Sequence, residues 1–155
     1  MTTLTRRYRF SASHRLHSHA LSDAENAELY GKCNNPFGHG HDYVLEVTAA
    51  GEIDEETGLL LPVAELDRLV QSEILPLFSH RNMNLDVPQF ARLVPTTENV
   101  ALVIAELLQE RWKLRPRLHR VHVQETDRNG FEVLAGAPQN ESSLDRQRES
   151  VTLNA

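Results

Sequence analysis

The sequence has a single cysteine, Cys33, which excludes an internal disulfide framework and fits a reducing compartment. It has no apolar run of about 18 residues and no hydrophobic stretch near Met1 typical of a signal peptide. It also lacks an excess of positive charge, because its formal net charge is −6. These absences predict a cytoplasmic protein that neither enters a membrane nor binds nucleic acid through general electrostatic attraction.

What is present is typical of one folded domain. The chain has 155 residues, of which 40% are hydrophobic and 25% are charged. This length is sufficient to bury a core without disulfides or other cross-links. From Pro138 onward the sequence is polar, and we therefore expect a single domain over residues 1–137 and a loosely ordered tail over residues 138–155.

Histidine is crowded into one part of the chain. Five of the eight histidines fall within 28 residues: His14, His17, His19, His39 and His41. On extended chain, His39 and His41 point to the same face, roughly 6–7 Å apart along the strand, which suits two imidazole ligands on one metal. His14 can supply a third imidazole. Cys33 is then either a further ligand, which would close a structural zinc site, or a base beside an open, catalytic zinc.

Hydrophobic periodicity predicts the elements. Alternation predicts strands over residues 3–13, 41–51, 117–125 and 131–134. Apolar stripes predict two helices, one opened by Pro62 and one that follows Pro95-Thr96-Thr97 with a threonine as its N-cap. Residues 17–35 and 78–94 are expected to be loops. The order β-β-α-α-β-β predicts an α+β fold: a four-stranded antiparallel sheet with two helices on one face. Such a sheet has exposed edges, and assembly of several subunits into a ring or barrel would cover them.

Two glutamates are candidates for function. Alternation along the third strand places Glu125 on one face with His119, Val121 and Val123, so we expect it to be partly buried and to need a partner or a role. Glu98 falls in the first turn of the second helix, where a favourable interaction with the helix dipole is sufficient to explain an acidic residue. His80, in a polar segment, says little by itself.

Several motifs occur in an order that resembles one enzyme family. They are Phe10-Ser11-Ala12-Ser13-His14, Gly31-Lys32-Cys33-Asn34-Asn35 with Gly38-His39-Gly40-His41, Pro95-Thr96-Thr97-Glu98-Asn99-Val100-Ala101, and Glu125-Thr126-Asp127. Together they are similar to the 6-pyruvoyl-tetrahydropterin synthase family from about Leu4 to Leu134. Two further segments place the resemblance in its animal-type branch: Leu16-His17-Ser18 and Leu21-Ser22-Asp23-Ala24-Glu25-Asn26.

The resemblance implies a fold and a reaction. The fold is the tunnelling fold (T-fold), in which trimeric rings stack into a hexamer with active sites at subunit interfaces. The reaction converts 7,8-dihydroneopterin triphosphate to 6-pyruvoyl-tetrahydropterin, eliminates triphosphate and belongs to tetrahydrobiopterin biosynthesis. The enzyme is a carbon–oxygen lyase acting on phosphates, and its cofactor is Zn²⁺.

The resemblance also assigns roles to residues. His14, His39 and His41 match the zinc ligands, and Cys33 matches the base that removes a proton, for which a thiolate with a pKa near neutral is needed. Glu98, with Thr97 beside it, matches the anchor of the pterin ring, Glu125 matches a residue of a charge relay, and His80 matches a histidine lent to the cysteine of the neighbouring subunit.

One position departs from the family. Ser79 stands directly before His80, where the family has an aspartate. A serine hydroxyl can orient an imidazole, but it has no charge to stabilise the imidazolium, and loss of the orienting carboxylate from a protease triad costs about 10⁴ in rate. Another acid, for instance Glu125, could compensate. If the missing charge limits turnover, replacing Ser79 by aspartate should raise it.

Two other functions compete with this one. The first is 6-carboxytetrahydropterin synthase, a relative whose pattern has three residues between the cysteine and His-Gly-His. Five residues stand there in this chain, from Asn34 to Gly38, which favours the pyruvoyl type. The second is a pterin-binding zinc protein with weakened catalysis, which Ser79 motivates.

Overall fold

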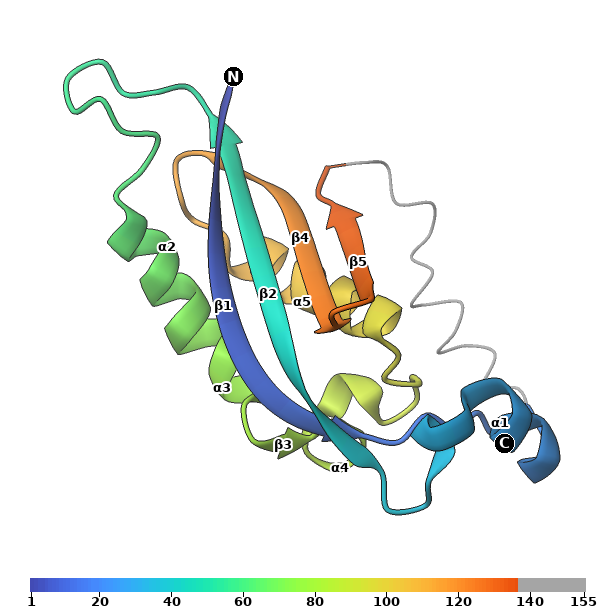
Figure 1. The fold of residues 1–155 in the computed structure, drawn as a ribbon. Helices are drawn as coiled ribbons and strands as arrows, with labels where there is room; N and C mark the ends of the chain where they lie inside the picture. The colour runs from blue at the N-terminus through green and yellow to red at the C-terminus, as the bar shows by residue number, and fades with distance from the viewer. Residues whose placement is uncertain (137–155) are drawn as a thin grey trace.

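The sheet has five strands, one more than predicted. The computed structural model describes residues 1–136, and the predicted tail lies outside them (Figure 1). Within that range the strand order is β3-β1-β2-β4-β5. The strands are β1 (Thr2–His14), β2 (His39–Gly51), β3 (Arg81–Asn82), β4 (Arg117–Thr126) and β5 (Asn129–Leu134). Neighbours are antiparallel except β3, which pairs parallel to the end of β1 and, with two residues, is too short to leave a periodic pattern.

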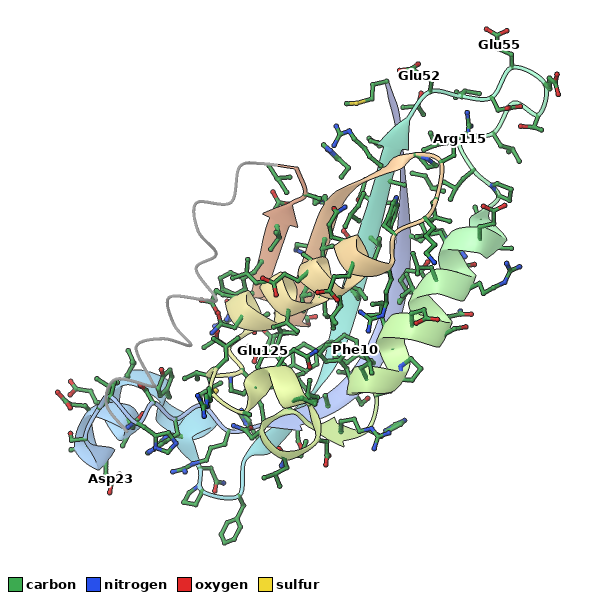
Figure 2. All side chains as sticks on the ribbon, turned by 180° about the vertical axis from the view of Figure 1, so that it is seen from behind. Phe10, Asp23, Glu52, Glu55, Arg115 and Glu125 are labelled. Atoms are coloured by element: carbon green, nitrogen blue, oxygen red, sulfur yellow. The ribbon has the colours of Figure 1, made fainter. Side chains whose placement is uncertain are left out.

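The main helices cover one face of this sheet, as predicted (Figure 2). The first begins at Val63 and continues as α2 (Val63–Leu69), a π-helical turn (Val70–Ile74) and α3 (Leu75–Phe78). Pro76 has no N–H to donate to the preceding turn, and the helix widens into the π form just before it. The other is α5 (Thr97–Arg111), whose apolar side buries Val100, Ile104 and Leu108 against the sheet.

The predicted loop over residues 17–35 is wrong in part, because it contains helix α1 (Asp23–Tyr30) and a 3₁₀ turn (Gly31–Asn34). Ser22 caps α1 by accepting from the Glu25 N–H, and the Glu25 carboxylate accepts from the Ser22 N–H. Asn26 is the only residue of the helix that is buried, so the helix has no apolar stripe. The segment 78–94 likewise contains β3, α4 (Met83–Asp86) and a 3₁₀ turn (Pro88–Phe90).

Strand β4 differs from simple alternation at two places. Ala49 pairs with Leu118 and Thr48 with Arg120, so a bulge takes up His119, and Leu118 is buried on the face of Val121 instead of His119. A second irregularity lies at Glu125, since the register passes from Gln124 to Thr126. Bulges redirect side chains at the ends of strands. The first bulge explains why His119 does not share the buried face, whereas Glu125 is largely buried, as alternation predicts.

The pairing of β1 with β2 places the candidate residues at one end of the sheet. His14 lies opposite His39, and Ala12 lies opposite His41. The start of α5 reaches the same end, because the carbonyl group of Pro95, just before the helix, contacts the His14 ring. Among residues 1–136, no helix combines the length and the apolar character needed to cross a membrane.

Candidate metal centre and active site

Three imidazole rings meet at the end of the β1–β2 hairpin. The ring centroids of His14 and His39 are 5.2 Å apart, those of His14 and His41 are 5.0 Å apart, and those of His39 and His41 are 4.6 Å apart. The structure therefore brings together the three histidines that the sequence predicts as metal ligands. Register alone accounts for this, since the three side chains occupy neighbouring positions on one face of two paired strands.

The backbone sets the orientation of His14. Its side chain is fully buried, and its Nδ1 lies 2.8 Å from the carbonyl oxygen of Pro95. Because a carbonyl oxygen can only accept, Nδ1 carries the proton and Nε2 keeps its lone pair. A backbone carbonyl that fixes a histidine in this way is typical of the outer shell of metal sites. Sequence reasoning missed this contact, since any residue at position 95 has a carbonyl.

The Nε2 atoms of His14, His39 and His41 are buried and have no hydrogen-bond partner among the described residues. Glu125 adds a further acceptor, with its Oε1 3.4 Å from Nε2 of His14 and 3.2 Å from Nε2 of His41. A lone pair and a carboxylate oxygen this close repel each other unless a proton or a cation lies between them. Burial lowers the pKa of His14 and of His41, more than the charge of Glu125 raises it, and so disfavours the proton. The donor set therefore fits a bound metal cation.

Cys33 belongs to the same cluster. Its Sγ and ligand atoms of His14 and His39 all lie within 4.8 Å of one another, as do those of His14, His41 and Glu125. Burial raises the pKa of the Cys33 thiol, and the charge of Glu125 raises it further. The surrounding protein groups thus favour the thiol, so a thiolate base at neutral pH requires positive charge nearby.

Hydrogen bonds tie the cysteine loop to the chain that follows His14. The Leu16 N–H donates to the Cys33 carbonyl over 2.8 Å, and the side-chain amide of Asn34 donates to the Leu16 carbonyl over 2.7 Å. Gly38 completes the loop with a φ of +69°, and a Cβ there would lie 2.6 Å from the carbonyl oxygen of His14. Only glycine fits this close approach.

The predicted substrate-binding residues lie in the first turn of α5. Thr96 caps the helix by accepting from the Asn99 N–H. Thr97 is only 4% exposed, whereas Glu98 is exposed. Burial raises the pKa of Tyr30, the last residue of α1, and the charge of Glu98 raises it further. Glu98 is therefore the group of this turn that is available to a ligand, and Tyr30 is a neighbour that the sequence did not indicate.

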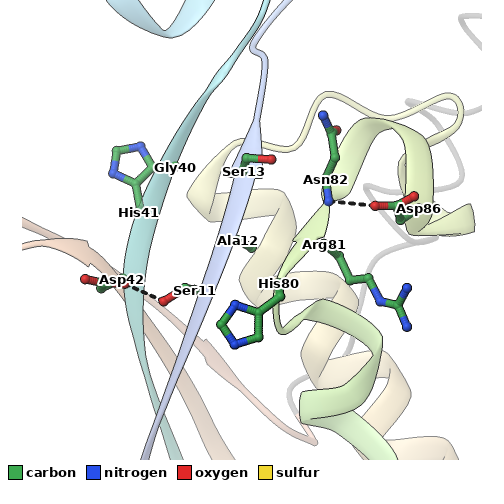
Figure 3. Close-up of a pocket in the computed structure, with 10 residues that line it drawn as sticks. All are labelled: Ser11, Ala12, Ser13, Gly40, His41, Asp42, His80, Arg81, Asn82 and Asp86. Atoms are coloured by element: carbon green, nitrogen blue, oxygen red, sulfur yellow. Dashed lines mark hydrogen bonds between the residues drawn. The ribbon is translucent and has the colours of Figure 1, made fainter.

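His80 lines a cavity together with residues of β1, β2 and β3 (Figure 3). The cavity has a volume of about 620 Å³, and its lining includes Ser11, Asp42 and one edge of the metal cluster, His41. Cys33 is not among the described residues that line it. Of the three predicted catalytic residues, the fold thus groups Cys33 and Glu125 around His14 and holds His80 apart.

The sequence profile described as 6-pyruvoyl tetrahydropterin synthase matches residues 3–135 of this chain. The chain belongs to this family. A 6-pyruvoyl tetrahydrobiopterin synthase of Homo sapiens is 50% identical over 128 residues, which are 81% of this chain and 86% of the human protein. The enzyme of the same name from Drosophila melanogaster is 46% identical over 126 residues, 81% of this chain and 75% of the fly protein.

Solved structures agree with this assignment to the 6-pyruvoyl tetrahydropterin synthase family. The Caenorhabditis elegans 6-pyruvoyl tetrahydropterin synthase superposes with a TM-score of 0.82 at 41% identity, covering 87% of this chain and 96% of the nematode chain. The predicted family and T-fold are therefore confirmed, with five strands in place of four. The chain is an enzyme, a carbon–oxygen lyase acting on phosphates.

Proposed function

We propose that this chain is a zinc-dependent 6-pyruvoyl-tetrahydropterin synthase that converts 7,8-dihydroneopterin triphosphate to 6-pyruvoyl-tetrahydropterin and triphosphate. The observation that carries the proposal is the buried cluster beside Cys33 of three Nε2 atoms that have no hydrogen-bond partner within residues 1–136. His14, His39 and His41 hold the zinc ion. When bound, zinc supplies Lewis-acid chemistry to the hydroxyl groups of the substrate side chain.

Other side chains bind the substrate, transfer protons and balance charge. Glu98, with Thr97 beside it in the same turn, anchors the pterin ring, and Cys33 removes a proton from the substrate side chain. Glu125 lies 3.2 Å from His41 and carries the charge that balances the cluster. Cys33 depends on cationic surroundings because burial raises the pKa of its thiol. His80 supplies acid–base help from a neighbouring subunit, in a hexamer whose active sites lie at subunit interfaces.

The test is turnover by purified protein reconstituted with zinc. We expect release of triphosphate from 7,8-dihydroneopterin triphosphate and a product with the mass of 6-pyruvoyl-tetrahydropterin. A product with the mass of 6-carboxytetrahydropterin would instead assign the relative with that activity. If the protein is folded and loaded with zinc but releases no triphosphate, the lyase proposal fails and a pterin-binding zinc protein is left.

A pair of variants separates the two possible roles of Cys33. As a base, Cys33→Ala should lower kcat by about 10²–10⁴-fold and keep the zinc content, because general-base catalysis contributes that much. His39→Ala, the matched control, should lose zinc. Loss of zinc from Cys33→Ala as well would make the cysteine a ligand and the site a closed structural one.

A further inference from the structure

His80 is held in an unusual conformation for a residue with a side chain. Its φ is +56°, and among the described residues other than glycine it is the only one with a positive φ. Its N–H donates to the Ser11 carbonyl over 2.6 Å. Since Arg81 pairs with Ala12 and Asn82 with Ser13 in parallel register, His80 stands level with Ser11 at the start of β3. The fold therefore fixes His80 beside this serine.

Ser11 connects the histidine to an acid on the next strand. Ser11 and Asp42 are direct cross-strand partners in β1 and β2, and the Ser11 hydroxyl donates to the Asp42 carboxylate. Figure 3 shows the His80 ring on the β3 side of Ser11 and Asp42 on its other side. Asp42, Ser11 and His80 thus form one row across three strands of the sheet, and all three line the same cavity.

The donor and acceptor groups of this row are complementary. A serine hydroxyl has one proton and two lone pairs. Because the proton of Ser11 goes to Asp42, a lone pair is left to accept an N–H from the imidazole of His80. Such an arrangement orients the ring and places a negative charge behind it, as a carboxylate does in a catalytic triad.

Four other residues are less suited to this role, two that line the cavity and two that do not. Asp86 already accepts the Asn82 N–H over 2.8 Å, and Arg81 is a cation, so it cannot serve as the carboxylate. Ser79, beside His80 in the chain, has no charge. Glu125 is engaged with His14 and His41 in its own chain.

We propose that Asp42, acting through Ser11, is the positioning carboxylate of His80 and takes over the role that Ser79 cannot fill. The proposal rests on the proposed function, in which His80 serves as an acid–base group. Asp42 does not touch the substrate in this arrangement, and its effect passes through the tautomer and charge of the histidine.

The first test is Asp42→Asn in the zinc-loaded enzyme, with 7,8-dihydroneopterin triphosphate as substrate. We expect kcat to fall by about 10–100-fold, less than the roughly 10⁴-fold of a buried triad because His80 is exposed, while KM and zinc content stay close to wild type. Asp86→Asn removes the same charge from the same cavity and should leave kcat within about twofold. Ser11→Ala should match Asp42→Asn, and the double variant should be no worse than either, because one route is interrupted.

The second test adds a carboxylate at position 79, directly before His80 in the chain. Ser79→Asp should restore most of the kcat lost in Asp42→Asn but raise that of the wild type much less, since the wild-type histidine already has its carboxylate. Unchanged kcat in Asp42→Asn, loss of zinc from it, or no recovery with Ser79→Asp would overturn the proposal. An inactive wild-type enzyme would instead overturn the proposed function.

Discussion

At the residue scale, the geometry of the metal cluster depends on backbone groups as much as on histidines. The Pro95 carbonyl fixes the tautomer of His14, and the carbonyl of His14 in turn lies against Gly38. Position 38 is therefore a point where one added carbon would disturb both the cysteine loop and the first histidine.

Replacing Gly38 by alanine should destabilise the protein and weaken metal binding. Gly58 is a matched control, because its φ is +70° against +69° for Gly38, but no atom lies within 4 Å of an added Cβ there. In both variants alanine is strained by the positive φ, but only in Gly38→Ala does the added Cβ also clash with the His14 carbonyl oxygen. We expect Gly38→Ala to lose roughly 1–2 kcal/mol more unfolding free energy than Gly58→Ala in urea titrations, and to bind less zinc. Equal losses in the two variants would show that the contact with His14 is unimportant.

At the element scale, a polar clamp joins the first strand to the first long helix. The guanidinium of Arg6 donates twice to the Asp67 carboxylate, over 3.0 and 2.8 Å, and the Tyr8 hydroxyl donates to it over 2.9 Å. The hydrogen bond from Arg6 is the main reason why the pKa of Asp67 is lowered. Because Arg6 and Tyr8 belong to β1 and Asp67 to α2, the clamp holds the helix layer on the sheet.

Asp67→Asn should reduce the unfolding free energy by about 1 kcal/mol at pH 7, a small value because the pair is partly exposed. A carboxylate with a lowered pKa stabilises the fold above its ordinary pKa of about 4, and that contribution is lost as the pH falls through the folded value. The difference from wild type should therefore shrink as the pH falls below about 4 and through the lowered pKa of the folded state. Glu65→Gln, an exposed carboxylate on the same helix, should show a smaller change; a constant difference across this pH range would exclude the ionic contribution.

At the scale of the whole molecule, the single chain has a sheet with unpaired edges, and two of its proposed catalytic residues do not line one cavity. One edge of β5 has no partner strand among residues 1–136, and β1 is paired on its outer side only at Ala12 and Ser13. His80 lies in a cavity that does not include Cys33. Both features are consistent with the proposed hexamer, in which Cys33 and His80 of one active site come from different chains.

Complementation tests this division directly. Cys33→Ala and His80→Ala should each be nearly inactive alone, yet co-expressed chains should recover roughly a quarter of the wild-type kcat, because random assembly reunites intact groups in that share of sites. Light scattering should give the mass of a hexamer for both variants. If mixed oligomers form and no activity returns, Cys33 and His80 act within one chain. If His80→Ala is active alone, His80 is not required.

Much of this protein can be predicted from its sequence, and the reason is that the signals are local. The period of the apolar residues in β1, β2 and α5 predicts a sheet covered by helices, and the spacing of His39 and His41 predicts a shared face. The order of the motifs along the chain indicates the family, because each motif is a short segment that can be recognised without the fold. Helix α1 was not predicted, because it is held by a capping box and a buried asparagine, which leave no periodic apolar signal.

The sequence by itself determined which chemical groups are present: three imidazoles, one thiol and the glutamates around them. Only the tertiary structure decided their relationships. The bulge at Glu125, the Pro95 carbonyl behind His14 and the row from Asp42 to His80 each depend on strand register or on contacts between distant segments. Burial, which raises the pKa of Cys33, is likewise a property of the assembled chain, because solvent exclusion requires neighbours from several elements at once.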